Sequence, residues 1–177
     1  MKRVFRVLYV FACVAVCAFA SCPSYAGNDG VLVGNYGDWN VYTFLDGGKK
    51  VCFMSGQPRK QEGNYKKRGE AFFFVTHWFG EGNKNVVSVS NGYSFKEGAP
   101  ATVSTGGREF SLFTRDEMAW TENQEEDDAL VALLQKESSL VVMGTSSRGT
   151  KTTDTYSLKG SAAAWREMTK ECTATAK

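Results

Sequence analysis

Short runs of apolar and β-branched residues, separated by glycine and asparagine, dominate the chain beyond position 30. Runs of this length and composition are typical of β-strands. The segments 39–45 and 50–54 flank Asp46-Gly47-Gly48, which predicts a hairpin turn. The segment 71–79 is apolar at successive positions, which predicts a central strand buried on both faces. Further strands are expected at 86–89, 101–104, 108–114, 140–145 and 152–158.

Two segments repeat their apolar residues at helical spacing instead. The first helix is expected to begin at Thr121, whose hydroxyl can cap it while Gln124 reaches back. The second covers about 161–172. The apolar positions are Leu130, Leu133 and Leu134 in the first helix and Trp165, Met168 and Cys172 in the second. Together with the short strands and regular turns, they predict a mainly β, antiparallel β-sandwich with two short helices.

The N-terminus has the pattern of a cleaved secretory signal peptide, covering residues 1–26. A basic head precedes the apolar run 7–20, which is too short for a stable membrane anchor, and Ser24-Tyr25-Ala26 resembles a cleavage site. An uncleaved anchor, or a lipoprotein attached through Cys22, are the alternative interpretations. Residues 27–177 are then expected to form a single domain without a transmembrane segment.

Removal of the expected signal peptide changes the net charge and the number of cysteines. Residues 1–26 hold three of the 21 basic residues and none of the 19 acidic ones, which leaves a formal charge of −1. This balance does not predict binding to nucleic acid or to an anionic membrane. Cys52 and Cys172 remain, and an even pair in an oxidising compartment predicts a disulfide that tethers the C-terminal helix. Two free thiols or a metal pair are the alternatives.

The sequence offers little that could carry catalysis. Its single histidine, His77, lies in the most apolar predicted strand, where a core residue with one hydrogen-bonded nitrogen is expected rather than a catalytic base. No nucleophile elbow, phosphate loop or metalloprotease motif occurs. The acidic run 125–128 fits the first turn of a helix better than a metal site. The protein is therefore not expected to be an enzyme or to need a metal or cofactor.

Two segments carry the candidate binding residues. The polar stretch 57–69 includes Lys66, Lys67 and Arg68, which suit an acidic partner or phosphate headgroups. The Ser/Thr-rich hairpin 144–155 includes Arg148, Thr153 and Asp154, and its row of hydroxyls suits a glycan or a peptide. The alternatives are a mobile loop, a solvated β face, and an Arg148–Asp154 pair that only shapes the turn. Exposed aromatics at Trp78, Tyr93 or Trp120 are a third possible feature.

The second hairpin also carries a resemblance to a known family. The run from Gly144 to Leu158, followed by Gly160, an alanine-rich helix and Cys172, resembles the C-terminal signature of the invasion-associated locus B family. The other matching stretches are 37–39, 52–53, 57–69, 86–93 and 108–120. The resemblance covers nearly all of the chain after the expected signal peptide.

The resemblance implies an exported bacterial protein with an immunoglobulin-like sandwich core and no established catalytic residues. It also implies a location in the periplasm, or in association with the outer membrane or cell surface. We therefore expect a non-enzymatic envelope protein that contributes to host-cell association or invasion by binding a protein or glycan partner. A lectin-like glycan-binding module and a general envelope-maintenance factor are the alternatives.

Overall fold

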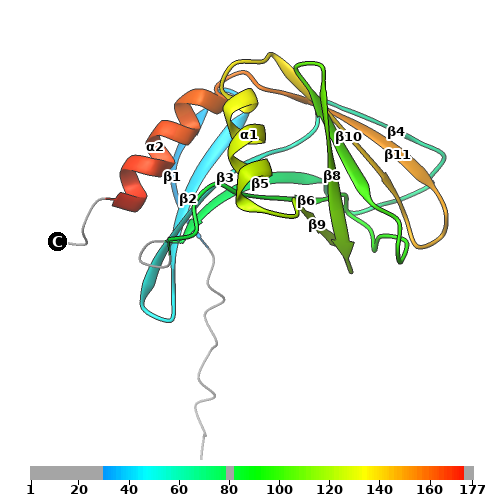
Figure 1. Cartoon of the computed structure of the whole chain (residues 1–177), viewed down its shortest axis with the longest axis horizontal. Coiled ribbons are helices and arrows are strands. Elements are labelled where there is room, and N and C mark those ends of the chain that lie inside the picture. The colour runs from blue at the N-terminus through cyan, green and yellow to red at the C-terminus, as the bar shows by residue number, and fades with distance from the viewer. Residues whose placement is uncertain (1–29, 79–81, 174–177) are drawn as a thin grey trace, which may run out of the picture.

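The computed structural model describes residues 30–78 and 82–173, and in this part of the chain eleven strands and two helices follow one another (Figure 1). The strands are β1 (Val31–Tyr36), β2 (Trp39–Asp46), β3 (Lys49–Gly56), β4 (Lys60–Gly63), β5 (Phe72–Trp78), β6 (Val86–Ser90), β7 (Ala101–Thr105), β8 (Arg108–Arg115), β9 (Met118–Trp120), β10 (Ser139–Thr145) and β11 (Lys151–Ser157). The helices are α1 (Gln124–Leu134) and α2 (Ser161–Thr173). Neither helix is long and apolar enough to span a membrane. The predicted signal peptide lies outside the described residues.

All eight predicted strands and both predicted helices are confirmed, with boundaries that shift by a few residues. The sequence analysis missed β1, β4 and β9. β4 consists of four exposed residues, Lys60 to Gly63, and forms only because it pairs with β11 at the edge of the sheet. Such a strand carries no hydrophobic alternation, so its sequence reads as a loop.

The strands form one antiparallel sheet in the order β1-β2-β3-β5-β6-β9-β8-β7-β10-β11-β4. β8 joins the two halves of this sheet, which are β1-β2-β3-β5-β6-β9 and β7-β10-β11-β4. Its segment 108–112 pairs with β7, whereas its segment 113–115 pairs with β9. The mainly β, antiparallel architecture is confirmed. The immunoglobulin-like sandwich is not confirmed, since the strands make one continuous sheet rather than two separate ones. That sheet is arched in Figure 1, which is compatible with a sandwich-like core.

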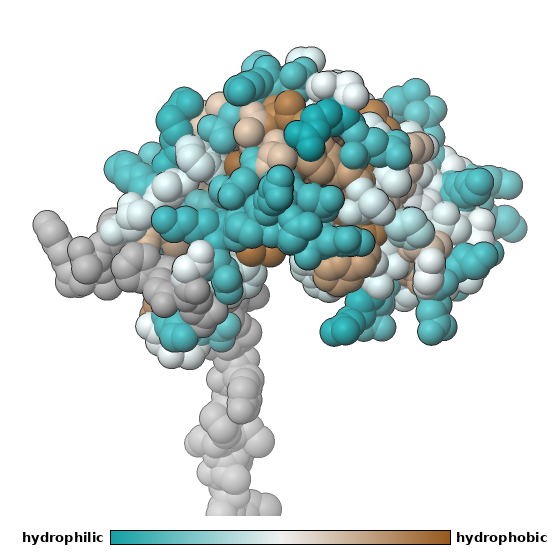
Figure 2. All heavy atoms as spheres, in the orientation of Figure 1, coloured by the Kyte–Doolittle hydropathy of each residue, from teal (hydrophilic) through white to brown (hydrophobic). Residues whose placement is uncertain are grey.

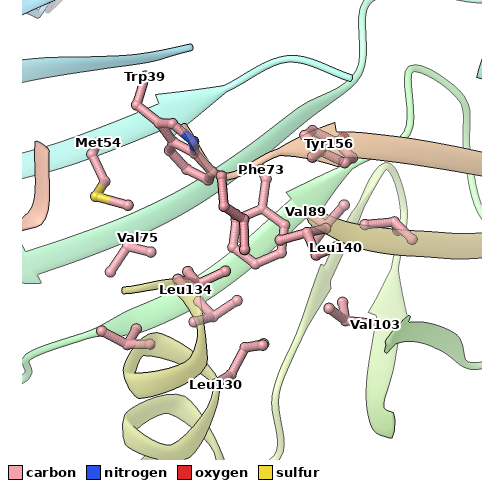
Figure 3. Packing of buried hydrophobic residues seen from close by; sticks show 14 of the residues in the cluster. Trp39, Met54, Phe73, Val75, Val89, Val103, Leu130, Leu134, Leu140 and Tyr156 are labelled. Carbon is pink, nitrogen blue, oxygen red and sulfur yellow. The ribbon is translucent and has the colours of Figure 1, made fainter. Parts of the chain in front are cut away.

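The core lies where the arched sheet brings β2 and β5 against β11 (Figure 3). Trp39 Nε1 on β2 donates a hydrogen bond to the Ser157 carbonyl oxygen at 3.0 Å. The Phe73 and Tyr156 rings meet edge to face, with 6.0 Å between their centroids. Leu130 and Leu134 of α1 belong to the same buried cluster. These contacts hold together segments that are far apart in the sequence.

β5 is central in its half of the sheet, between β3 and β6, as predicted. Its burial alternates, however: Phe73, Val75 and His77 are buried, whereas Phe72 and Phe74 are only half-buried. The prediction of two fully buried faces is therefore wrong. On the outer face, aromatic rings of neighbouring positions cover one another, as the stacked Phe72 and Phe74 rings do at 5.6 Å.

The N-cap of α1 lies two residues later in the sequence than predicted. Asn123 is the N-cap, and its side chain accepts a hydrogen bond from the Glu126 N–H at 3.0 Å. Thr121 instead donates to the buried Asp127 carboxylate, which also accepts the Val87 N–H at 2.7 Å. The Asp127 carboxylate thus attaches the helix to β6, and Thr121 bonds to this carboxylate instead of capping the helix.

The C-terminal helix α2 is not covalently tethered. Cys52 on β3 and Cys172 on α2 are buried free thiols, so the predicted disulfide is not supported. Cys52 is the cross-strand partner of His77, and the Cys172 thiol donates to the His77 carbonyl oxygen at 3.5 Å, so the two cysteines lie in the same region. Sequence reasoning anticipated the proximity of the sulfurs, but a bond between them also requires oxidation, which folding alone does not provide.

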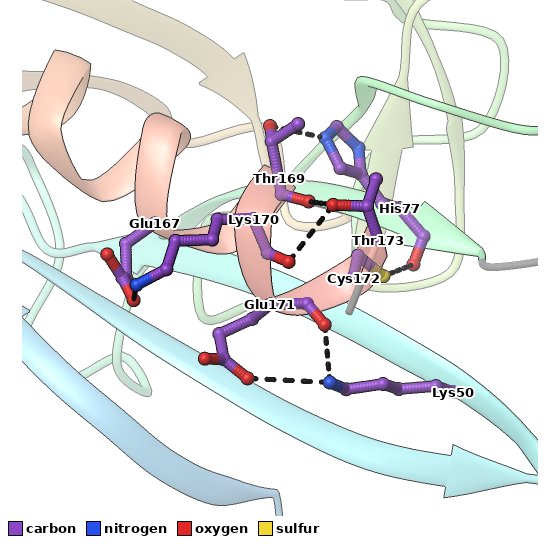
Figure 4. Close-up of polar contacts among 8 residues, drawn as sticks. All are labelled: Lys50, His77, Glu167, Thr169, Lys170, Glu171, Cys172 and Thr173. Atoms are coloured by element: carbon purple, nitrogen blue, oxygen red, sulfur yellow. Dashed lines mark hydrogen bonds and ion pairs between the residues drawn. The ribbon is translucent and has the colours of Figure 1, made fainter. Parts of the chain in front are cut away.

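Non-covalent contacts attach α2 to the sheet instead. Its buried residues pack against β2, β3 and β5. At its C-terminal end, Lys50 on β3 hydrogen-bonds to the Glu171 carbonyl oxygen and forms an ion pair with the Glu171 carboxylate at 3.4 Å (Figure 4). The His77 ring meets the Thr169 hydroxyl at 3.1 Å in the same region.

Candidate functional site

A cleft of about 510 Å³ opens where the predicted basic stretch meets the predicted hydroxyl-rich hairpin, beside the β10–β11 turn. This turn lies at the lower right of Figure 1. The lining residues are Asn64, Tyr65, Lys66, Lys67, Arg68, Gly92, Tyr93, Ser94, Ser146, Ser147, Arg148, Thr150 and Thr152. Its volume lies within the range of roughly 300–1,000 Å³ that is usual for ligand pockets. Two candidate binding segments that are far apart in the sequence therefore form one site.

The segment 64–69 is held in place by a close approach of two backbones. Gly69 N–H donates to the Gly92 carbonyl oxygen at 2.8 Å. Gly92 has a φ of +69°, and a Cβ added there would lie 2.2 Å from the Gly69 carbonyl oxygen. The opposite wall is attached in the same way, because Ser147 N–H donates to the Ser94 carbonyl oxygen at 2.7 Å. Only glycine fits at position 92 in this arrangement.

A buried ion pair forms the floor of the cleft. Arg68 Nη2 lies 2.8 Å from Asp154 Oδ2, and the two side chains are 5% and 0% exposed. The Arg68 guanidinium lies over the Tyr65 ring at 5.1 Å and the Tyr93 ring at 5.9 Å from their centroids. The predicted alternative, a pair between Arg148 and Asp154, is wrong because Asp154 points beneath the surface while Arg148 is exposed at the turn.

Further polar groups surround this pair. Asn91 Nδ2 donates to the Tyr93 hydroxyl at 3.0 Å, and the Tyr93 and Thr152 hydroxyls are 2.6 Å apart. Several buried atoms lack a hydrogen-bond partner among the described residues: Arg68 Nε and Nη1, Asp154 Oδ1, Asn91 Oδ1 and the Tyr156 hydroxyl. Buried groups of this kind usually bind water or ligand.

Burial is the main influence on the pKa values of the ionisable side chains in the floor of the cleft. It raises the pKa of the Asp154 carboxyl above its ordinary value of 3.8, while the hydrogen bond and charge of Arg68 act in the opposite direction. Burial also raises the pKa of the Tyr156 hydroxyl, with the Asp154 charge acting in the same sense. Removing these groups from water therefore disfavours their charged forms more than Arg68 favours them.

The six candidate binding residues thus separate into three groups. Lys66, Lys67 and Arg148 are exposed at the cleft and form no ion pair or side-chain hydrogen bond within residues 30–78 and 82–173. Arg68 and Asp154 lie beneath them. Thr153 does not line the cleft; it lines a smaller hollow of about 170 Å³ beside Met143.

Sequence reasoning missed part of the site. Asn91 and Gly92 were counted only among the glycine and asparagine residues that separate the strands, and Thr152 only as part of the hairpin. Tyr93 was named only as a possible exposed aromatic, whereas its hydroxyl belongs to the network under the cleft. The Asn-Gly pair was the available signal, because such a pair often marks a backbone with positive φ.

His77 lies outside the cleft and is 4% exposed. Its Nδ1 accepts the Asn85 N–H at 2.9 Å, so Nε2 carries the proton that faces Thr169. Burial lowers the pKa of His77 below its ordinary value of 6.5. Both ring nitrogens are engaged, rather than the one that was predicted. Among the described residues, no cluster of three or more His, Cys, Asp or Glu side chains is placed to hold a metal ion.

A second hollow, of about 540 Å³, lies beside β2 and β3. Its charged lining residues have both signs, Asp38, Arg59 and Glu70, and Arg59 forms an ion pair with Asp38. The charge in this hollow is therefore largely internally compensated, unlike that of the basic cleft.

Comparison with known proteins places the chain in a family. The model of the invasion associated locus B (IalB) protein family matches residues 39–169, which include both walls of the cleft. The chain belongs to the IalB family. A crystal structure of invasion associated protein b from Bartonella henselae shares the fold, with a TM-score of 0.56 and 18% sequence identity. The alignment covers 80% of this chain and 96% of the Bartonella chain. No curated protein matches the chain.

Proposed function

We propose that this IalB family member is exported from the cytoplasm and acts at the bacterial envelope or cell surface as a non-enzymatic binding protein. In this proposal it contributes to the association of the bacterium with host cells. Family membership and the fold shared with an invasion associated protein support the link to invasion. The N-terminal sequence pattern supports export.

The basic cleft is the observation that carries the binding role. Lys66, Lys67 and Arg148 present three positive charges to solvent, and no described acidic side chain neutralises them. The floor beneath them is held by the buried Arg68–Asp154 pair. A rigid site that displays uncompensated charge loses little entropy when a partner of opposite charge binds.

The composition of the cleft favours binding over hydrolysis. Its lining residues include no Asp, Glu, His or Cys, so the groups that usually act as general bases do not line it. Asp154, beneath the floor, is fully buried and already paired with Arg68.

The experiment compares binding of the purified, fluorescently labelled protein (residues 27–177) to host cells with that of two charge-matched variants. One variant carries Lys66→Gln, Lys67→Gln and Arg148→Gln in the cleft. The other carries Lys136→Gln, Lys159→Gln and Arg166→Gln, which are exposed residues that do not line the cleft. We expect saturable binding that only the cleft variant loses.

Cross-linking from intact bacteria then identifies the compartment in which the protein works. Host-surface material, enriched only when host cells are present, supports a direct role in entry. A bacterial envelope component as the dominant cross-linked partner, together with no saturable binding to host cells, would instead support the envelope-maintenance alternative.

The lectin-like alternative uses the same cleft, and one observation favours it. Ser147 and Thr150 come from the hydroxyl-rich hairpin and line the cleft opposite the basic segment. Hydroxyl groups beside tyrosine rings are well suited to hydrogen-bond a polyhydroxylated ligand.

A further inference from the structure

The charge of the cleft is local. The chain without residues 1–26 has a formal charge of −1. The charged residues that line the cleft are nevertheless all Lys or Arg, and the lining includes no Asp, Glu, His or Cys. Asp154 offsets only Arg68, because the two form their pair beneath the surface. A ligand that enters this cleft therefore meets three unpaired positive charges within one small volume, which favours an anionic ligand.

The same walls offer neutral hydrogen-bonding groups. The side chains of Asn64, Ser94 and Ser147 line the cleft and have no hydrogen-bond partner within the described segments. The Thr152 and Tyr93 hydroxyls, in contrast, are already bonded to each other. Free amide and hydroxyl groups among cations match a ligand that carries both hydroxyls and negative charge.

The floor of the cleft contains hydrogen-bond donors that lack an acceptor. Arg68 is one of the residues that line the cleft, its side chain is 5% exposed, and its Nε and Nη1 have no partner. Both atoms are buried, so an anionic oxygen in the cleft would satisfy them through an ordered water. The stacking of Tyr65 and Tyr93 on Arg68 keeps the guanidinium fixed for such a contact.

The surroundings argue against an anionic membrane as the source of that charge. Docking onto a bilayer usually adds exposed apolar side chains to the basic ones. The exposed large hydrophobic residues of the described chain are Val31, Leu32, Leu45, Phe113 and Met143, and none of them lines the cleft. On the face shown in Figure 2, brown hydrophobic residues form only small areas between hydrophilic ones.

From these observations we infer that the cleft binds an acidic oligosaccharide, a sugar chain that carries sulfate or carboxylate groups. The inference rests on the proposed binding function and names the class of its partner. Lys66, Lys67 and Arg148 contact the acidic groups, the amide and hydroxyl side chains contact sugar hydroxyls, and Arg68 is the fixed donor at the floor.

Calorimetric titration of the protein (residues 27–177) with three hexasaccharides tests the inference. The probes are a heparin hexasaccharide with sulfates and carboxylates, a hyaluronan hexasaccharide with carboxylates only, and the neutral maltohexaose. We expect at least one acidic probe to bind, no heat from maltohexaose, and weaker binding as salt is raised. The heparin and hyaluronan results distinguish sulfate from carboxylate as the recognised group.

The two charge-matched triple variants complete the test. The cleft variant should bind the acidic probe about tenfold more weakly or worse, since each charged hydrogen bond contributes substantially. The variant at Lys136, Lys159 and Arg166 should bind like the unmodified protein. Equal loss in both variants, or equal binding of maltohexaose, would overturn the inference.

The failure of this inference can be distinguished from failure of the proposed function. Saturable, cleft-dependent binding to host cells that persists without any binding to the acidic probes would overturn the acidic ligand alone and indicate a protein partner. Absence of host-cell binding would overturn the host-association role, whatever the oligosaccharides do.

Discussion

Arg68 and Asp154 are 86 positions apart in the sequence, yet they form an ion pair of 2.8 Å whose side chains are almost completely buried. The pair joins the segment that follows β4 to the strand β11, and it forms the floor of the cleft. Its burial means that Asp154 offsets the charge of Arg68, whereas the unpartnered Nε and Nη1 atoms of Arg68 remain as donors at the floor of the cleft.

The first prediction concerns this pair. Asp154→Ala leaves the Arg68 guanidinium buried without its partner, and breaking a buried ion pair in this way typically costs about 3–5 kcal/mol. We expect a loss of this size in the free energy of unfolding, measured by urea denaturation. Replacing both residues, as Arg68→Met with Asp154→Leu, should cost less, because no unpaired charge remains. A wild-type midpoint for Asp154→Ala would contradict the account.

The second prediction concerns the backbone contact at Gly92. Gly92→Ala should destabilise the protein by more than Gly98→Ala, although the two glycines have nearly the same φ, +69° and +70°. A left-handed conformation costs a non-glycine residue about 1–2 kcal/mol at either position. Only at Gly92 does the new Cβ also meet backbone, 2.2 Å from the Gly69 carbonyl oxygen, whereas Gly98 has open space around it. Equal melting temperatures for the two variants would show that the contact is not tight.

The third prediction is a dependence of stability on pH that comes from His77. Its pKa is lowered in the folded state, chiefly by burial, so the folded protein resists a proton that the unfolded chain accepts below about pH 6.5. Stability from this group is therefore complete above pH 6.5 and falls as pH decreases, by up to about 1.4 kcal/mol per pH unit. Urea denaturation at pH 7.5 and 5.5 measures the loss.

The control for this experiment is His77→Gln, which removes the titrating group and retains an amide that can bond to Thr169. The raised pKa values of Asp127 and Asp154 act in the opposite sense at lower pH, because a proton on either carboxyl is favoured by folding. The difference between wild type and variant isolates His77. An unchanged pH dependence in His77→Gln would assign the effect elsewhere.

The fourth prediction concerns the two buried thiols. Burial raises the pKa of Cys52, and the neighbouring Cys172 side chain acts in the same direction, so little reactive thiolate forms near neutral pH. Alkylation of the native protein (residues 27–177) should therefore be slow and should become fast for both Cys52 and Cys172 once urea unfolds the chain. Mass spectrometry after alkylation counts the modified residues. An unfolded chain that accepts no alkyl group would show that the thiols are oxidised.

Most of the secondary structure and the family membership could be predicted from the sequence. Alternating apolar residues and glycine-rich turns depend on neighbours a few positions away, so β2, β3 and the β10–β11 hairpin were predictable. The long motifs of the hairpin likewise indicated the IalB family, whose model spans residues 39–169.

The composition of the site depends on tertiary contacts and could not be predicted from the sequence. Strand order sets which distant segments meet, and the position of β4 beside β11 brings the basic segment 64–68 to the Ser/Thr-rich hairpin. The same arrangement of strands places Arg68, rather than Arg148, beside Asp154. Local sequence patterns carry no information about such contacts. A buried ion pair or a close backbone approach joins segments that are far apart in the sequence, and these segments meet only when the complete sheet forms.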